Sequence, residues 1–356
     1  MDLELTEEQQ LLRETVRGLC ARHAGLDVVR QLENDPVGYP EKFWLQLGEA
    51  GLLDVSELST LDAVVMYQEL GRALAPSPHF VSSVVSAGVL RGAGSEAQRA
   101  EWLPRLASGD AIITPAWLEP EGGFGPAGVQ VRLDGDGRVT GTKRHVQFAG
   151  GADRLLVVAR GTDDEVSFVL VDPKGPDVQL TQQQTIASDT QYRVDLDGAV
   201  GEPLATGGWS VWDDVMHDGI ILLGAQAAGG ARYALDITVQ YAKDRKQFDK
   251  PLGAFQAIAH YLADAVTAVD GAETLVYEAA WARDAARPVA RLAPMAKLFA
   301  CQTFRDVTAM AQQVFGGVGF TVEYDIQLYF RRAKQLQLSW WNDRYLEELI
   351  AAEVLD

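Results

Sequence analysis

The feature that most constrains the fold is a set of three long apolar stripes in the C-terminal part of the chain. Small or apolar side chains recur every three to four residues in the first stripe, as expected for one face of a helix, at Ile220, Leu223, Ala227, Ala231, Ala234, Ile237 and Tyr241. A second stripe follows in 258–269 and a third in 293–315. Helices of this length pack best as an antiparallel bundle, which we expect over residues 208–356.

The two segments before the bundle differ from each other in composition. Thr6 with Gln9, and Ser95 with Gln98, form capping-box pairs that begin helices, so residues 1–110 are predicted to be an N-terminal helical domain. Residues 111–207 alternate short β-branched runs with Gly, Asp and Pro, and the DGDG stretch at 134–137 indicates a hairpin turn. The sequence predicts a mainly α protein with an antiparallel β domain or small barrel in the middle.

The composition argues against several kinds of partner. A net charge of −19 disfavours nucleic acid, since phosphate binding needs clustered Lys and Arg, and it disfavours an anionic membrane surface. The longest uncharged stretch of the C-terminal half, 219–231, is shorter than the about 20 residues that span a bilayer. Neither Cys20 and Cys301 nor the five scattered histidines have metal-ligand spacing. We therefore expect a reduced, cytoplasmic chain without a metal site.

A short stretch after the first stripe, DRKQFDKPLGAFQ at 244–256, combines three ligand-binding residue types. The planar guanidinium of Arg245 can bind a pyrophosphate through paired hydrogen bonds. Phe248 offers an aromatic surface for a purine, and Gln256 can both donate and accept a hydrogen bond. The simpler alternative is a charged cap, because cations favour a helix C-terminus.

A glycine-rich stretch, QQVFGGVGF at 312–320, ends the third helical stripe. Glycines at this point let the backbone approach a ligand closely, although such a turn is often only a helix C-cap. The order of helices, β segment and bundle, with R-x-x-F, a Gln eleven residues after the Arg and Q-x-F-G-G-x-G-F, resembles the acyl-CoA dehydrogenase family. The resemblance covers essentially all 356 residues.

This resemblance implies a cofactor, partners and site residues. The cofactor is FAD, which lies mainly in the neighbouring subunit and is shared across the subunit interface. The resemblance also implies an acyl-CoA substrate and an electron-transfer flavoprotein as partner. The residues implied to hold the adenosine and pyrophosphate of FAD are Arg245, Phe248, Gln256, Gln313, Gly316 and Gly317.

The carboxylate base that the family uses is absent from both usual positions. In the family, this base takes the α-proton of an acyl thioester while hydride leaves Cβ for the flavin. Counting 27 residues on from Gln313 gives Trp340, inside the sequence LSWWND, and the alternative base position gives Gly219. Asp343 and Asp218 are the nearest other candidates, but a shift of one residue turns a side chain about 100° around a helix.

The segments that line the flavin ring in the family are also altered. The chain has TPAWLEPEGGFGPAG, at 114–128, where the family has a Thr-Glu-Pro…Gly-Ser-Asp loop. His145 and Gln147 replace the Trp and Thr of the family's Trp-Ile-Thr strand. The resemblance therefore implies that this chain's own active site is incomplete, although the adenosine-side residues are present.

Three hypotheses for function follow. The first is the base-lacking subunit of a heteromeric α2β2 acyl-CoA dehydrogenase, paired with a homologous subunit that carries the catalytic Glu. Two-gene enzymes of this kind in actinobacteria often act on bulky CoA thioesters such as steroid side chains, but the sequence does not specify the acyl group. The second is a homo-oligomeric acyl-CoA dehydrogenase with Asp218 or Asp343 as base. The third is a flavin-free acyl-CoA binding or structural subunit.

Overall fold

The computed structural model describes residues 4–187 and 189–355. Its helices and strands confirm the predicted class, a mainly helical protein with a β middle region. The chain divides into two compact units that interleave along the sequence. One, the bundle unit, comprises residues up to Asp27, Leu58–Ala75 and residues from Ile220 on, and the other, the barrel unit, comprises Val28–Glu57 and Pro76–Gly219. The boundaries drawn at 110 and 207 from sequence remain a prediction.

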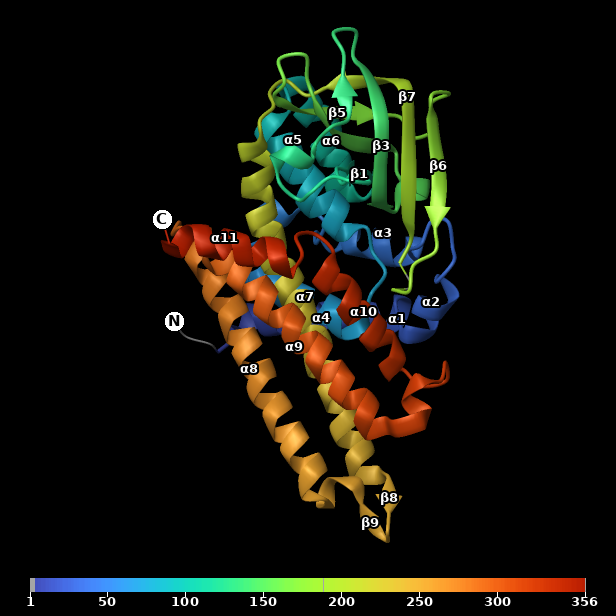
Figure 1. Ribbon diagram of the computed structural model, residues 1–356, viewed down its shortest axis with the longest axis vertical. Coiled ribbons are helices and arrows are strands. Elements are labelled where there is room, and N and C mark those ends of the chain that lie inside the picture. The colour runs from blue at the N-terminus through green and yellow to red at the C-terminus, as the bar shows by residue number, and fades with distance from the viewer. Residues whose placement is uncertain (1–3, 188, 356) are drawn as a thin grey trace. The chain divides into compact units, whose positions relative to one another are not determined.

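The bundle unit consists of long helices, which Figure 1 shows in blue near the N-terminus and in yellow to red near the C-terminus. Helix α7 is 36 residues long, and its residues from Ile220 on belong to this unit. A small hairpin, β8 (Lys246–Gln247) and β9 (Lys250–Pro251), connects α7 to α8. The helices are α1 (Glu7–His23), α4 (Thr60–Ala73), α7 (Trp209–Asp244), α8 (Gln256–Asp284), α9 (Leu292–Phe315), α10 (Ile326–Leu338) and α11 (Asp343–Leu355), with the short η5 (Leu252–Ala254) and η6 (Gly316–Phe320).

The predicted close helix packing occurs where α4 crosses α7. A Cβ added to Gly229 would lie 2.0 Å from the carbonyl oxygen of Gln68, and one added to Gly71 would lie 1.9 Å from that of Gln226. Because no side chain fits at either point, the two backbones pack directly against each other. Gly229 on α7 and Gly71 on α4 therefore set the distance between these two helices.

The barrel unit contains the β strands, and they close into a ring. Strand β4 pairs with β5, β5 with β7, β7 with β3, β3 with β2, and β2 returns to β4 through one parallel pair. Strand β1 adds to β4 in parallel and β6 adds to β7. The strands are β1 (Ile113–Ala116), β2 (Arg132–Leu133), β3 (Arg138–Gln147), β4 (Arg154–Arg160), β5 (Val166–Val171), β6 (Val178–Gln183) and β7 (Gln191–Pro203).

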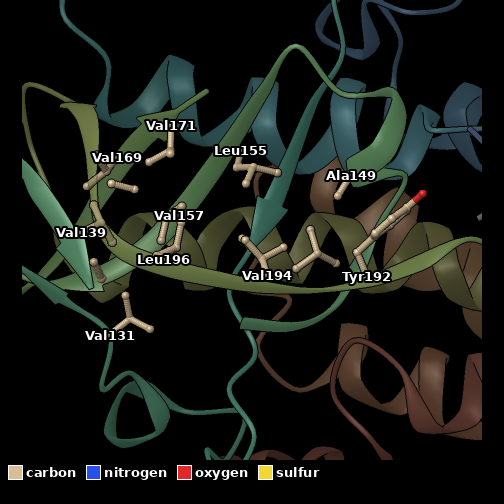
Figure 2. Close-up of a cluster of buried hydrophobic side chains, with 14 residues drawn as sticks. Val131, Val139, Ala149, Leu155, Val157, Val169, Val171, Tyr192, Val194 and Leu196 are labelled. Atoms are coloured by element: carbon tan, nitrogen blue, oxygen red, sulfur yellow. The ribbon is translucent and has the colours of Figure 1, made fainter. Parts of the chain in front are cut away.

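The core of the barrel unit is built by the β-branched runs of the sequence. Alternate residues of β4 and β7, among them Leu155, Val157 and Val194, are fully buried. Figure 2 shows these side chains converging from neighbouring strands. The unit also contains α2 (Leu26–Gln31) in large part, α3 (Glu41–Glu49), η1 (Val55–Glu57), the π-helical η2 (Phe80–Ser86), α5 (Ala87–Ala93), α6 (Glu96–Ser108), η3 (Pro126–Gly128) and η4 (Ala149–Gly151).

Local signals in the sequence are found where they were predicted. Both capping boxes are formed, at Thr6 before α1 and at Ser95 before α6. Gly109 ends α6 in a left-handed conformation with φ of 86°. The 134–137 turn joins β2 to β3, with the amide of Gly137 donating to the carbonyl of Asp134. Among the described residues, no helix combines the length and apolar character needed to cross a bilayer, and no cluster of side chains is arranged to hold a metal.

Candidate functional site

The predicted adenosine-side residues begin at the C-terminal end of α7. The amide of Arg245 donates to the carbonyl of Tyr241, and the carbonyl of Arg245 accepts from the amide of Leu252, which closes the β8–β9 hairpin. Phe248 sits in this hairpin with φ of 51° and is 86% exposed. Gln256 is the first residue of α8 and is exposed. The hairpin therefore presents these side chains outward.

A stacked aromatic pair brings the second motif to the same end of the bundle unit. The rings of Tyr241 and Phe315 lie 4.1 Å apart, centroid to centroid, at an interplanar angle of 16°. Gln313 precedes Phe315 by two residues and is exposed, while Gly316 follows it. The stack therefore holds the end of α7 and the end of α9 together, so that the two motifs, far apart in sequence, are close in space.

The chemistry of this cluster fits the adenosine diphosphate part of FAD. Within the described ranges, the Arg245 side chain makes no hydrogen bond or ion pair, so its donors can bind a phosphate. A Cβ added to Gly316 or Gly317 would meet no atom within 4 Å, and Gly316 has φ of 66°, so the backbone there is open to a ligand. These observations fit the cofactor, and the assignment itself remains a prediction.

One polar residue beside this cluster was not predicted from the sequence. Gln312 is 4% exposed, and neither its amide nitrogen nor its oxygen finds a partner among the described residues. An unpaired buried amide is costly, which makes Gln312 a further candidate for contact with a ligand or water. The motif could not reveal it, because the resemblance fixes only the second Gln of the QQ pair, Gln313.

The turn that the residue count matches to the family's base holds two buried tryptophans. Trp340 is 7% exposed and Trp341 is fully buried. Both have left-handed backbones, with φ of 52° and 70°, which bulky residues rarely adopt. Such a conformation persists only where surrounding contacts enforce it.

A buried lysine supplies part of that enforcement. The Nζ of Lys297, on α9, donates to the carbonyl of Leu336 at 3.1 Å and to that of Trp341 at 2.9 Å, on either side of the turn. Lys297 is fully buried, and burial lowers the pKa of its ammonium. This contact could not be predicted from the sequence, since a lysine in an apolar helix is most simply interpreted as a surface residue.

The alternative base candidate on this turn, Asp343, is already engaged by amides. Its Oδ2 accepts from Nε2 of Gln337 at 2.6 Å and from Nε2 of Gln302 at 3.3 Å. These two hydrogen bonds fix the orientation of the carboxylate. Asp343 therefore acts as a structural acceptor at the N-terminus of α11 in this arrangement.

The second base position, Gly219, faces an aromatic ring of the same barrel unit. A Cβ added to Gly219 would lie 3.2 Å from Cζ and 3.3 Å from Cε2 of Phe80. A glutamate side chain at this position would therefore need Phe80 to move. Its neighbour Asp218 is partly buried, and His217 places its Nδ1 2.8 Å from the carbonyl oxygen of Asp213.

The positions that line the flavin ring in the family carry a polar network here. Nδ1 of His145 lies 2.8 Å from Oε1 of Gln191, whose Nε2 donates to Asp189 at 2.6 Å. Gln147 also donates to Asp189, at 3.2 Å. His145 has φ of 55° at an irregularity of the β3–β7 ladder. His145 is thus tied to β7, and Gln147 to Asp189, two residues before that strand begins.

Strand β3 also carries a buried ion pair just before His145. Nζ of Lys143 donates to Oε1 of Glu119 at 2.7 Å and to the carbonyl of Trp117 at 3.1 Å. The same carboxylate oxygen accepts from the amides of Gln130 and Val131. Burial lowers the pKa of Lys143 to about 8, although Glu119 opposes that shift. This pair fixes the loop at 114–128 to the strand.

Comparison with known proteins agrees with the fold and the motifs. Residues 6–110 match the family model "Acyl-CoA dehydrogenase, N-terminal domain", and residues 206–355 match "Acyl-CoA dehydrogenase, C-terminal domain". The chain is 32% identical over 336 residues to the acyl-CoA dehydrogenase IpdE2 of Mycobacterium tuberculosis, covering 92% of this chain and 91% of that relative.

Two solved structures share the fold over almost their whole length. The ChsE4–ChsE5 complex from Mycobacterium tuberculosis matches with a TM-score of 0.90 and 29% identity, covering 100% of this chain and 99% of that one. A variant of the Tcur3481–Tcur3483 steroid ACAD matches with a TM-score of 0.87 and 30% identity, covering 98% and 99%. On the motifs, the fold and these likenesses, the chain is a member of the acyl-CoA dehydrogenase family of oxidoreductases.

Proposed function

We propose that this chain is the non-catalytic subunit of a heteromeric acyl-CoA dehydrogenase and that it contributes adenosine-side FAD contacts to a catalytic partner. Members of the family bind FAD. In this assignment Arg245 binds the pyrophosphate, Phe248 contacts the adenine, and Gln256, Gln313 and the Gly316–Gly317 backbone complete the contacts. The partner is a homologous subunit that carries the catalytic Glu, in an α2β2 assembly.

One observation carries the proposal: both base positions are closed by aromatic side chains. Trp340 and Trp341 are packed in the core of the bundle unit, and Phe80 lies against Gly219 in the barrel unit. General-base catalysis needs a carboxylate within reach of the proton, and neither position carries one. The exposed cluster around Arg245 has the opposite pattern, since the Arg245 guanidinium and the side-chain amides of Gln256 and Gln313 make no hydrogen bond or ion pair within the described chain.

The reaction of the complex would then be divided between the two chains. FAD bound there would supply the hydride acceptor for oxidation of an acyl-CoA thioester, and the partner's carboxylate would be the group that takes the α-proton. This chain's residues hold the adenosine diphosphate part of that cofactor through the Arg245 guanidinium and the two side-chain amides. The likeness to the ChsE4–ChsE5 complex and to a steroid ACAD supports the heteromer and a role in steroid oxidation. The proposal further includes fatty acid oxidation as an alternative role, a cytoplasmic location and an electron-transfer flavoprotein as electron acceptor.

The decisive measurement is FAD stoichiometry. We expect one FAD for each pair of chains in the assembled complex, because only one of the two kinds of subunit has an intact flavin environment. Flavin released by denaturation is quantified by absorbance against total protein from amino-acid analysis. A ratio near one FAD per chain contradicts the half-site proposal.

Expression alone and together with a partner separates the alternatives. The proposal predicts a colourless chain when it is expressed alone and yellow protein only on co-expression with a homologue that carries the base. Yellow, active protein from this chain alone supports the homo-oligomer with Asp218 or Asp343 as base. Colourless protein in both cases supports a flavin-free acyl-CoA binding subunit.

A further inference from the structure

The bundle unit contains a cavity that none of the proposed FAD contacts uses. Its volume is about 310 Å³, at the lower end of the range of roughly 300–1,000 Å³ for small-molecule pockets. It is lined by side chains from α1, α4, α7 and α10, helices that Figure 1 labels. Most of its wall is apolar, including Cys20, Leu26 and Ala73.

Two of the charged groups in the cavity wall neutralise each other. Arg17 donates to Glu69 through Nε at 2.8 Å and through Nη2 at 2.7 Å, a paired geometry that uses both carboxylate oxygens. Glu69 is 5% exposed, and its hydrogen bond raises the pKa of Arg17. This ion pair therefore leaves little net charge for a ligand to recognise.

Arg72 is the remaining charge of the wall, and its partners are few. Its guanidinium carbon lies 4.4 Å from the ring centroid of Tyr233, a cation–π contact that leaves the edge of the guanidinium open. Its one ion pair within the described chain is with Asp236, at 3.5 Å, and the Asp236 side chain is 52% exposed. A long, exposed pair of this kind contributes little and exchanges readily with a competing anion.

Two tyrosines complete the polar side of the cavity. The hydroxyl of Tyr329 donates to the carbonyl of Arg72 at 2.5 Å, which fixes the end of α4 independently of the Arg72 side chain. Tyr233 also lines the cavity, and its hydroxyl has no hydrogen-bond partner in the described part of the chain. The two rings lie 5.5 Å apart at an interplanar angle of 47° and add to the apolar surface.

We propose that this cavity is a binding site for a small amphiphilic monoanion, with its carboxylate on Arg72 and its apolar body between the tyrosine rings and the wall of Cys20, Leu26 and Ala73. One cation whose only ion pair within the described chain is the long, exposed one with Asp236 selects one negative charge. The chain has a net charge of −19, so a cavity wall with a net positive charge does not follow from the overall charge of the protein. It is a local feature of this site. None of the residues that line this site belongs to the proposed FAD contacts, so a test of one proposal does not decide the other.

The test is calorimetric titration of the full-length chain, purified alone or with its partner, using octanoate as the probe. Octanol, which has the same tail without the charge, and inorganic phosphate, which has charge without a tail, serve as comparison ligands. We expect saturable binding of octanoate at one site per chain and much weaker binding of the other two. Equal binding of octanol or of phosphate overturns the proposal, as does the absence of octanoate binding at millimolar concentration.

Three variants test the role of Arg72. Arg72→Gln should weaken octanoate binding at least about tenfold, the loss expected for one charge-assisted hydrogen bond. Asp236→Asn removes the competing carboxylate and should strengthen binding severalfold, which a merely damaged protein cannot do. Arg291→Gln, at an exposed arginine with no ion pair within the described residues, should change nothing. Unchanged affinity in both Arg72→Gln and Asp236→Asn excludes the assigned site.

Discussion

The end of the bundle unit around Arg245 and the turn around Trp340 belong to the same unit but are built in opposite ways. At the first, charged, amide and aromatic side chains are exposed, and the charged and amide groups make no hydrogen bond or ion pair within the described chain. At the second, two tryptophans are buried at left-handed backbone angles, and a buried lysine hydrogen-bonds both sides of the turn. The first region can bind a ligand or a partner subunit, whereas backbone carbonyls of the second are hydrogen-bonded by a side chain of the same unit. This contrast is what the proposed non-catalytic subunit predicts, with its own active site incomplete and its contacts to a partner's cofactor kept.

The largest effect is expected at Arg245, in the open region. If Arg245 binds the pyrophosphate, Arg245→Ala should weaken FAD retention by the assembled complex by about 2–5 kcal/mol, the usual cost of removing one partner of a desolvated charge pair. Arg245→Lys should recover only part of this loss, because an ammonium cannot form the paired hydrogen bonds. Fluorescence titration of the apo complex with FAD measures both.

Arg245→Ala should also distinguish the two regions by its small effect on stability. Since Arg245 makes no side-chain contact within the described chain, Arg245→Ala should leave the free energy of unfolding of the isolated chain within about 0.5 kcal/mol. Arg291→Ala is the matched control for FAD retention. Equal FAD affinity in wild type and Arg245→Ala removes the assigned role.

In the closed region, Lys297→Met should destabilise the chain by about 2–3 kcal/mol. The substitution keeps the length of the side chain, but the carbonyls of Leu336 and Trp341 lose their donor in a buried site. Urea unfolding measures the change. Lys334→Met, at an exposed lysine on the neighbouring helix, should stay within about 0.5 kcal/mol, and a similar value for both means that other contacts hold the turn.

Closure of the second base position can be tested by a double-mutant cycle. Gly219→Glu should destabilise the chain by about 1–3 kcal/mol, because the new side chain overpacks against the Phe80 ring. Phe80→Ala removes that ring, so the double variant should be less destabilised than the sum of the single ones, by about 0.5–3 kcal/mol. Strict additivity would mean that Phe80 does not close this position.

The buried pair beside the altered flavin segment predicts a pH dependence. The pKa of Lys143 is lowered to about 8 in the folded chain, so between pH 8 and 10.5 the unfolded state binds more protons. Stability from this group therefore rises with pH across that window, on the order of 1–2 kcal/mol. The measurement is the difference in unfolding free energy between wild type and Lys143→Met at pH 7.5 and pH 10. If this difference in unfolding free energy falls between pH 7.5 and pH 10, burial does not lower the pKa of Lys143.

The smallest effect is expected at the remaining carboxylates. Asp343→Asn should leave turnover of the assembled complex within about tenfold, far from the 10²–10⁴ expected for loss of a general base. Asp218→Asn should behave in the same way. An assay with an acyl-CoA substrate and an artificial electron acceptor decides this, and a thousandfold loss from either variant assigns the base to this chain.

For the same reason Trp340→Glu should not activate the isolated subunit, because one carboxylate does not rebuild a flavin environment.

Local patterns predicted the fold well, because they depend on neighbouring residues. The capping boxes at Thr6 and Ser95, the turn at 134–137 and the apolar stripes all report on contacts within a few residues or one helix face. The positions of Arg245 and Gln313 came from the family resemblance instead, and their proximity depends on the Tyr241–Phe315 stack. No pattern in a single sequence specifies such a pair across 74 positions.

The features that close the active site were harder to foresee. Counting residues placed Trp340 and Gly219, but it could not show that Phe80, from a different helix, lies against Gly219. Nor could it show Lys297 reaching the turn at 336–341, since both contacts join segments that meet only in the folded chain. Left-handed angles at two tryptophans run against local preference and are set by tertiary packing.

The interleaving of the two units has a consequence for how the protein is made. All residues of the barrel unit have been synthesised once translation reaches Gly219, but the bundle unit needs α1 and α4 from the start of the chain together with everything after Ile220. Chains grow at about 5–20 residues per second. The apolar side chains of α4 that are buried in the folded unit, among them Val64, Val65 and Met66, therefore lack the C-terminal helices for a time on the order of tens of seconds. Until then the nascent chain contains the complete barrel unit together with α4, whose apolar side chains are not yet covered by the C-terminal helices. Ribosome-bound chaperones, which bind exposed apolar segments, therefore have a defined interval in which to act on this protein.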